Sequence, residues 1–144
     1  MTDNVKDSID IEATAEEIFE VAADYENYPK WQDQVKKVEI LETDDDGYGT
    51  AVYYEVDAVV KKLSYTLEYD YQGWPKYFTW KLRDGDVKSL RGKYTFEEFD
   101  DVTEVGYEIS VDPGFKLPAV LKRRGEKQIV ATALKGLKLR VESG

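Results

Sequence analysis

The sequence contains neither cysteine nor histidine, and both absences narrow its possible chemistry. Without cysteine the chain can form no disulfide bond and has no thiolate nucleophile. Without histidine it lacks the commonest general base, the usual transition-metal ligand and the partner that activates a serine or cysteine nucleophile. The residues therefore argue against a metal site and against hydrolases of the Ser-His or Cys-His kind, and we expect no cofactor.

Basic charge and long apolar runs are also scarce. The net charge is −10, so the chain lacks the basic surface that nucleic-acid binding and attraction to anionic membranes require. The N-terminal residues contain no apolar run of the kind found in a signal peptide or a membrane span. We expect a cytoplasmic protein without nucleic-acid binding or membrane insertion, with residues 1–144 forming a single domain whose apolar content of 42% suffices for a core.

The C-terminal stretch, residues 118–142, is the only one long enough for a major helix. Four apolar residues recur at steps of four, three and four and form one helical stripe: Val130, Leu134, Leu137 and Val141. Gly125 costs roughly 1 kcal/mol relative to alanine inside a helix and predicts a kink or a late start there. The stripe requires a broad apolar surface to pack on.

A second stripe on the same predicted helix consists of Ile129, Ala133 and Gly136. Small residues at such positions mark close backbone packing if the interior is solid, or leave room for a ligand if it is hollow. We expect the second case, in which Ala133→Phe fills the cavity at a modest cost in stability and abolishes ligand binding.

Most of the remaining chain alternates between apolar and polar residues, as half-buried strands do. The predicted strands are residues 5–11, 35–42, 51–60, 63–71, 77–83, 87–99 and 103–111. Thr14 and Glu17 form a capping box that opens a helix through Tyr25, and residues 28–31 form a short aromatic turn at Pro29. Because short hairpins join consecutive strands, the fold class is α+β with a curved antiparallel sheet gripping the last helix.

The strand faces predicted to point inward are rich in aromatic residues. This set comprises Tyr54, Tyr65, Tyr69, Phe78, Trp80, Tyr94, Phe96 and Tyr107. An aromatic stripe usually fills a core, but each buried tyrosine hydroxyl needs a hydrogen-bond partner. Several hydroxyls beneath one helix are satisfied more easily by water or ligand than by each other, and this favours a cavity for a hydrophobic ligand.

An acidic turn at residues 44–49 partly matches a calcium-binding loop. Asp44, Asp46, Gly49 and Glu55 occupy suitable positions, but Tyr48 stands where an oxygen ligand is needed and strands flank the segment. A β-hairpin connection is the better interpretation.

The sequence resembles the START-like (SRPBCC) superfamily, in its polyketide cyclase/dehydrase and coenzyme-Q-binding branch. The resemblance covers nearly the whole chain and is carried by short segments in a fixed order: Asp24, residues 28–31, 38–41, 67–71, 80–82, 92–96, 103–108 and 112–114, and the terminal helix. It implies a helix-grip fold: a seven-stranded antiparallel sheet around a long C-terminal helix, with two short helices after the first strand. Family members bind lipids, quinones, polyketides or other apolar molecules in a cavity between sheet and helix.

The combined reasoning gives a set of candidate ligand-binding residues. They are Trp31, Tyr54, Val56, Tyr65, Leu67, Tyr69, Phe78, Trp80, Leu90, Tyr94, Tyr107, Ile129, Ala133 and Leu137. The leading hypothesis is a non-catalytic binder of a hydrophobic or aromatic small molecule such as a lipid, quinone or polyketide.

Two alternatives remain open at the level of sequence. The first is a cyclase or dehydratase in which Tyr65, Tyr69, Tyr94 and Tyr107 polarise a carbonyl group, although no catalytic motif of the family carries over residue by residue. The second is a module that binds a protein or the ribosome, as one toxin branch of the superfamily does, through the basic cluster at residues 122–127. The net negative charge of the chain opposes this second alternative, and the protein partner is unknown.

Overall fold

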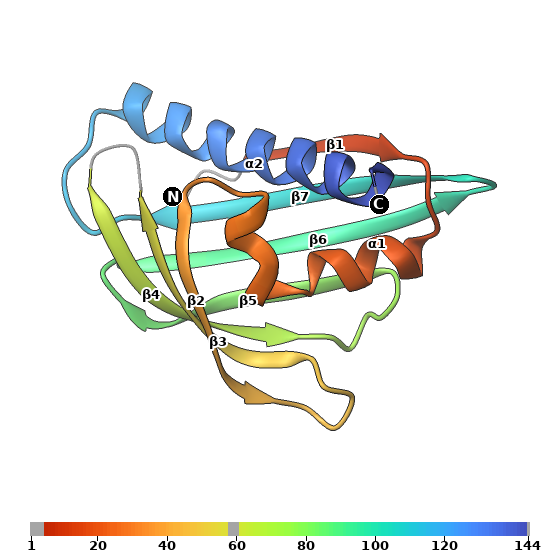
Figure 1. Ribbon diagram of the computed structural model, residues 1–144. Helices are drawn as coiled ribbons and strands as arrows, with labels where there is room; N and C mark the ends of the chain where they lie inside the picture. Colours follow the sequence, from red (N-terminus) through yellow and green to blue (C-terminus); the bar gives the residue numbers. More distant parts are fainter. Residues whose placement is uncertain (1–4, 58–60, 144) are drawn as a thin grey trace.

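The structure, a computed structural model, describes residues 5–57 and 61–143 (Figure 1). In chain order its elements are β1 (Val5–Ile11), α1 (Ala15–Ala22), the 3-10 helix η1 (Tyr25–Lys30), β2 (Val35–Thr43), β3 (Gly49–Asp57), β4 (Lys62–Asp70), β5 (Tyr77–Gly85), β6 (Ser89–Phe99), β7 (Val102–Asp112) and α2 (Ala119–Glu142). Residues 58–60, which the sequence assigns to a strand, lie outside the described residues.

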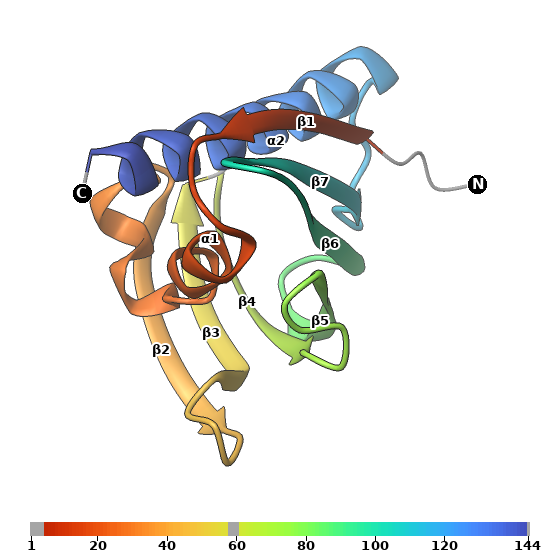
Figure 2. The ribbon, with the colours of Figure 1, turned by 90° about the vertical axis from the view of Figure 1, so that its right-hand side faces the viewer.

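All seven strands form one antiparallel sheet in the order β1-β7-β6-β5-β4-β3-β2. Neighbouring strands follow one another along the chain, except that β1 pairs with β7 at one edge. Figure 2 shows the sheet curving, with α1 inside the curve and α2 lying across its end beside β1 and β7. The expected α+β helix-grip fold with seven strands, a long C-terminal helix and two short helices after the first strand is confirmed.

Helix α1 begins at the predicted capping residue, because the Thr14 side chain accepts a hydrogen bond from the Glu17 amide at 3.2 Å. It ends at Ala22, so the expected continuation to Tyr25 is wrong. Asp24 has backbone angles of φ −89° and ψ 70°, which lie outside the helical region and interrupt the helix. Tyr25 instead opens η1, whose last turn contains Pro29.

Helix α2 runs without interruption from Ala119 to Glu142, so the late start expected at Gly125 is wrong. Its main stripe is buried at Val130, Leu134 and Leu137, as the spacing predicts. Burial of this stripe against the sheet outweighs the helix propensity lost at one glycine, which is roughly 1 kcal/mol.

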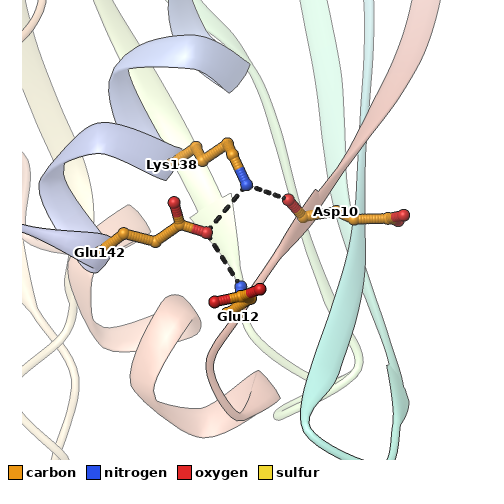
Figure 3. A network of polar contacts seen from close by, with 4 residues as sticks. All are labelled: Asp10, Glu12, Lys138 and Glu142. Carbon is orange, nitrogen blue, oxygen red and sulfur yellow. Dashed lines mark hydrogen bonds and ion pairs between the residues drawn. The ribbon is translucent and has the colours of Figure 1, made fainter.

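Polar contacts hold the C-terminal end of α2 against β1 (Figure 3). Lys138 Nζ donates a hydrogen bond to the Asp10 carbonyl oxygen at 2.6 Å and pairs with Glu142 Oε2 at 2.8 Å. The same Glu142 oxygen accepts a hydrogen bond from the Glu12 amide at 3.1 Å. One end of the helix is therefore attached to the edge strand, while Val120, Leu121 and Ile129 remain exposed towards the other end.

Candidate functional site: a cavity between the sheet and helix α2

A cavity of about 360 Å³ lies between the concave face of the sheet and the N-terminal half of α2. Its wall combines side chains of β3, β4, β5, β6 and β7 with the α2 segment from Leu121 to Thr132. Leu121 and Ile129 belong to this wall and are also exposed, Ile129 to 42%, so the cavity reaches the surface beside α2. Its size and its largely apolar wall are those of a small-molecule site.

Ten of the fourteen candidate residues lie on the cavity wall. They are Tyr54, Val56, Tyr65, Leu67, Tyr69, Trp80, Leu90, Tyr94, Tyr107 and Ile129. The strand residues among them alternate along β3, β4 and β6, so the period of two in the sequence already placed them on one face.

The other four candidates lie outside the wall. Phe78 is buried behind the wall, with its ring centroid 5.0 Å from that of Phe19 and 5.3 Å from that of the wall residue Tyr94. Ala133 and Leu137 are buried on the stripe of α2 that packs into the core rather than over the cavity. The lining residues of α2 end at Thr132, and the buried residues that follow pack into the hydrophobic core instead.

Trp31 is the fourth candidate outside the wall, and it accounts for Gly136. A Cβ atom at position 136 would lie 2.7 Å from Trp31 Cε3 and 2.9 Å from the Trp31 carbonyl oxygen. Gly136 is therefore small because the chain after η1 packs against α2 there, and the structure assigns neither Gly136 nor Ala133 the ligand space expected from the sequence.

Several residues of the wall were not predicted from the sequence. Glu126 is the most unusual, because it is a charged residue exposed to only 4%. It lies four residues before Val130 on the buried stripe of α2, so the same periodicity could have identified it. The remaining unpredicted residues come from the strands, the segments that join them and helix α2: Tyr28, Gln32, Gln34, Val35, Asp57, Leu63, Val87, Ile109, Val111, Pro113, Phe115, Leu117, Leu121, Lys122, Gly125, Gln128 and Thr132.

The strand register brings the aromatic side chains of the wall together. Tyr94 lies directly opposite Tyr107, Tyr69 opposite Trp80, and Tyr54 opposite Tyr65. The Tyr94 and Tyr107 ring centroids are 4.7 Å apart in an edge-to-face arrangement, and the Trp80 centroid lies 5.5 Å from that of Tyr94. Such contacts stabilise the rings beyond their burial alone.

The tyrosine hydroxyls differ in how they are satisfied. Tyr54 and Tyr69 share a hydrogen bond of 2.6 Å, whereas the Tyr28 hydroxyl donates to the Ala22 carbonyl oxygen. The Tyr94 hydroxyl is fully buried and has no hydrogen-bond partner among the described residues. Tyr94 lines the cavity, and because a buried polar group without a partner is costly, a ligand atom that hydrogen bonded to its hydroxyl would remove that cost.

Burial controls the protonation of these hydroxyls. It raises the pKa of Tyr65 to about 12 and is the largest cause of the raised pKa values of Tyr54, Tyr69, Tyr94 and Tyr107. All five phenols are therefore protonated at neutral pH. They can donate hydrogen bonds to a carbonyl oxygen, but they cannot act as general bases there.

Other chemistry has little support in the described residues. Among residues 5–57 and 61–143 no group of three or more acidic, histidine or cysteine side chains is placed to hold a metal ion. The acidic turn after β2 is a hairpin connection, in which Asp44 Oδ1 accepts hydrogen bonds from the amides of Asp46 and Tyr48, each at 3.0 Å. No helix of the described part is long and apolar enough to cross a membrane.

A curved antiparallel sheet closed by a long C-terminal helix, with a cavity between them, defines the START-like class of proteins. Residues 11–138 match the family described as polyketide cyclase / dehydrase and lipid transport, and the chain belongs to this family. The resemblance stated from the sequence is thereby confirmed. No curated protein matches the sequence.

Solved structures with the same fold come from distant sources. A START superfamily protein from Mycobacterium smegmatis shares 20% identity over 97% of both chains, with a TM-score of 0.88. The Zhui aromatase/cyclase from Streptomyces sp. R1128 shares 17% identity over 99% of this chain and 94% of its own, with a TM-score of 0.85. The major latex-like protein 151 of Panax ginseng shares 12% identity over 96% and 97% of the two chains, with a TM-score of 0.74. At these identities the comparisons establish the fold.

Proposed function

We propose that this protein binds a hydrophobic or aromatic small molecule, of lipid, quinone or polyketide type, in the cavity beneath α2 without transforming it. The observation that carries the proposal is a cavity of about 360 Å³ whose wall is mainly apolar and aromatic. Leaving such a surface in contact with water is unfavourable, and burying it against a ligand recovers roughly 25 cal/mol per Å² of apolar area. The ten candidate residues on the wall are the proposed contacts.

Native mass spectrometry of protein purified from its own host tests this proposal. We expect an excess mass that corresponds to a small apolar molecule and is lost on denaturation. A protein that is always empty, and that binds no quinone, fatty acid or polyphenol added afterwards, would count against the proposal.

A cyclase or dehydratase is the second candidate, and the Tyr94 hydroxyl favours it. A protonated phenol without a protein partner can donate to a substrate carbonyl and stabilise the negative charge that develops on its oxygen. The likeness in fold to the Zhui aromatase/cyclase is consistent with this candidate. Because the sequence has no histidine and the phenols are protonated, the possible bases among the described lining residues are the carboxylates of Asp57 and Glu126.

Single Tyr→Phe replacements at positions 65, 69, 94 and 107 separate the two candidates. A catalytic role predicts loss of turnover of a poly-keto substrate in at least one variant, with binding retained. If turnover of every tested substrate is the same in all four variants as in the wild type, the tyrosines have no catalytic role.

A further inference from the structure

The wall of the cavity contains two carboxylates, Glu126 and Asp57, to which a purely apolar ligand would offer no hydrogen bond. Glu126 is exposed to only 4%, and its Oε2 atom accepts a long hydrogen bond of 3.3 Å from the Val111 amide. Asp57 at the end of β3 exposes 43% of its side chain, but its Oδ1 atom is buried and has no partner among the described residues. Its Oδ2 atom lies 4.0 Å from Lys36 Nζ, so the two oxygens have different surroundings.

The opposite charge on the wall is smaller. Lys122 is the only basic residue among the lining residues that the structure describes. It lies one helical turn before Glu126, and no ion pair joins it to Glu126 or Asp57 within the described part of the chain. Lys36 Nζ lies 4.0 Å from Asp57 Oδ2, and Lys61 Nζ lies 4.4 Å from the ring centroid of the lining residue Phe115, so these two ammonium groups offset acidic charge near the cavity. The buried carboxylate of Glu126 has no ion pair among the described residues and is the local source of negative charge. An anionic ligand would experience repulsion here that a low-dielectric surface strengthens.

The other polar group, the Tyr94 hydroxyl, lies at a different depth. The Glu126 carboxylate accepts its hydrogen bond from Val111, which lies opposite Leu90 on β6. Tyr94 lies further along β6, opposite Tyr107. These two levels are four residues apart along β6, which corresponds to about 13 Å along a strand. Tyr94 is exposed to only 2% and its hydroxyl has no partner, so the deep level also requires a polar atom. The part of the wall between the levels is apolar.

We infer that the ligand is an uncharged or cationic aromatic molecule with a polar atom at each end, and that carboxylic acids such as free fatty acids are excluded. One end carries a hydroxyl or amine that donates to Glu126 or Asp57. The other carries an oxygen that hydrogen bonds to Tyr94, at a spacing of roughly 7 Å once the two hydrogen bonds are allowed for. This inference rests on the proposed function and specifies the class of ligand.

Three matched fluorescent probes test the inference. All are 2-naphthols, and they differ only at the 6-position, which carries a hydroxymethyl, an aminomethyl or a carboxyl group. Titration of the wild-type protein near neutral pH should give dissociation constants for the alcohol and the amine at least about tenfold lower than for the acid. Equal or tighter binding of the acid overturns the inference and leaves the proposed function intact. Binding of none of the three overturns the inference, and the native mass measurement then decides the proposed function separately.

Variants assign the discrimination to the named carboxylates. Glu126→Gln keeps the size of the side chain and should reduce the preference for the amine over the acid several-fold, with Asp57→Asn as the second variant if Glu126→Gln does not fold. Glu39→Gln on the exposed part of β2 is the matched control and should retain the full preference. An unchanged preference in both Glu126→Gln and Asp57→Asn overturns the inference.

Tyr94→Phe tests the deep end of the site. Loss of one hydrogen bond should weaken binding of the hydroxymethyl naphthol about two- to tenfold. The corresponding probe without the ring hydroxyl, 2-naphthalenemethanol, should bind both proteins equally. If the variant weakens both probes by the same factor, Tyr94 contributes only packing and the two-ended ligand is wrong.

Discussion

Replacing either of two tyrosines of the cavity wall, Tyr54 or Tyr94, by phenylalanine should have clearly different effects on stability. Tyr54→Phe removes the 2.6 Å hydrogen bond to Tyr69 and leaves the Tyr69 hydroxyl without that partner. The expected loss is about 1–2 kcal/mol in the free energy of unfolding. Tyr94→Phe removes a buried hydroxyl that has no protein partner, so it breaks no hydrogen bond within the described structure. The variant should unfold with an unchanged free energy, or one raised by up to about 1 kcal/mol.

Urea denaturation and thermal melts of the ligand-free proteins measure this difference. For a chain of 144 residues, 1 kcal/mol corresponds to about 3 °C in Tm. Tyr54→Phe should therefore melt about 3–7 °C below the wild type, and Tyr94→Phe at the same temperature or slightly above it. If Tyr94→Phe is as destabilised as Tyr54→Phe, the Tyr94 hydroxyl has a partner in the folded protein and is not available to a ligand.

Two further predictions follow from packing and burial. Ala133→Phe should lower the free energy of unfolding by about 1–3 kcal/mol through overpacking, because Ala133 is exposed to only 2% and lies outside the cavity wall. An unchanged urea midpoint together with abolished ligand binding would instead support the expectation drawn from the sequence. Burial raises the pKa of Tyr65 to about 12, so its contribution to stability is complete below about pH 10, the pKa in the unfolded chain, and is lost as the pH rises towards 12. Tyrosinate absorbance and urea midpoints measured together over this range check this, and a folded protein whose tyrosines all ionise near pH 10 would contradict it.

Much of the fold followed from local patterns. The alternation in β4, from Leu63 to Tyr69, predicted the face of that strand that lines the cavity. The stripe of α2 at Val130, Leu134 and Leu137 predicted the buried face of the helix. The capping box at Thr14 placed the start of α1. These features depend on neighbours along the chain, so they can be read without knowledge of the tertiary structure.

The site was less predictable because it depends on how elements cross. Periodicity placed Ala133 on an inward face of α2, but it could not tell whether that face covers the cavity or the core. Gly136 is small because Trp31, more than a hundred residues earlier in the chain, packs against it. Glu126 was overlooked because a charged residue is normally assigned to the solvent face, although its position on the stripe indicated burial. The contact between Trp31 and Gly136 leaves no local signal in the sequence.

The central claim, that the cavity beneath α2 is a ligand site, is tested most directly by filling it. Thr132 is half-buried and is the last residue of α2 on the cavity wall, so Thr132→Trp places a large side chain in the cavity. Lys135→Trp places the same side chain on the exposed face of the helix. Each variant is titrated with the neutral fluorescent probe N-phenyl-1-naphthylamine beside the wild type, with circular dichroism to confirm folding. We predict that the wild type and Lys135→Trp bind the probe and that folded Thr132→Trp does not. Undiminished binding by folded Thr132→Trp would show that the probe binds elsewhere and would contradict the account.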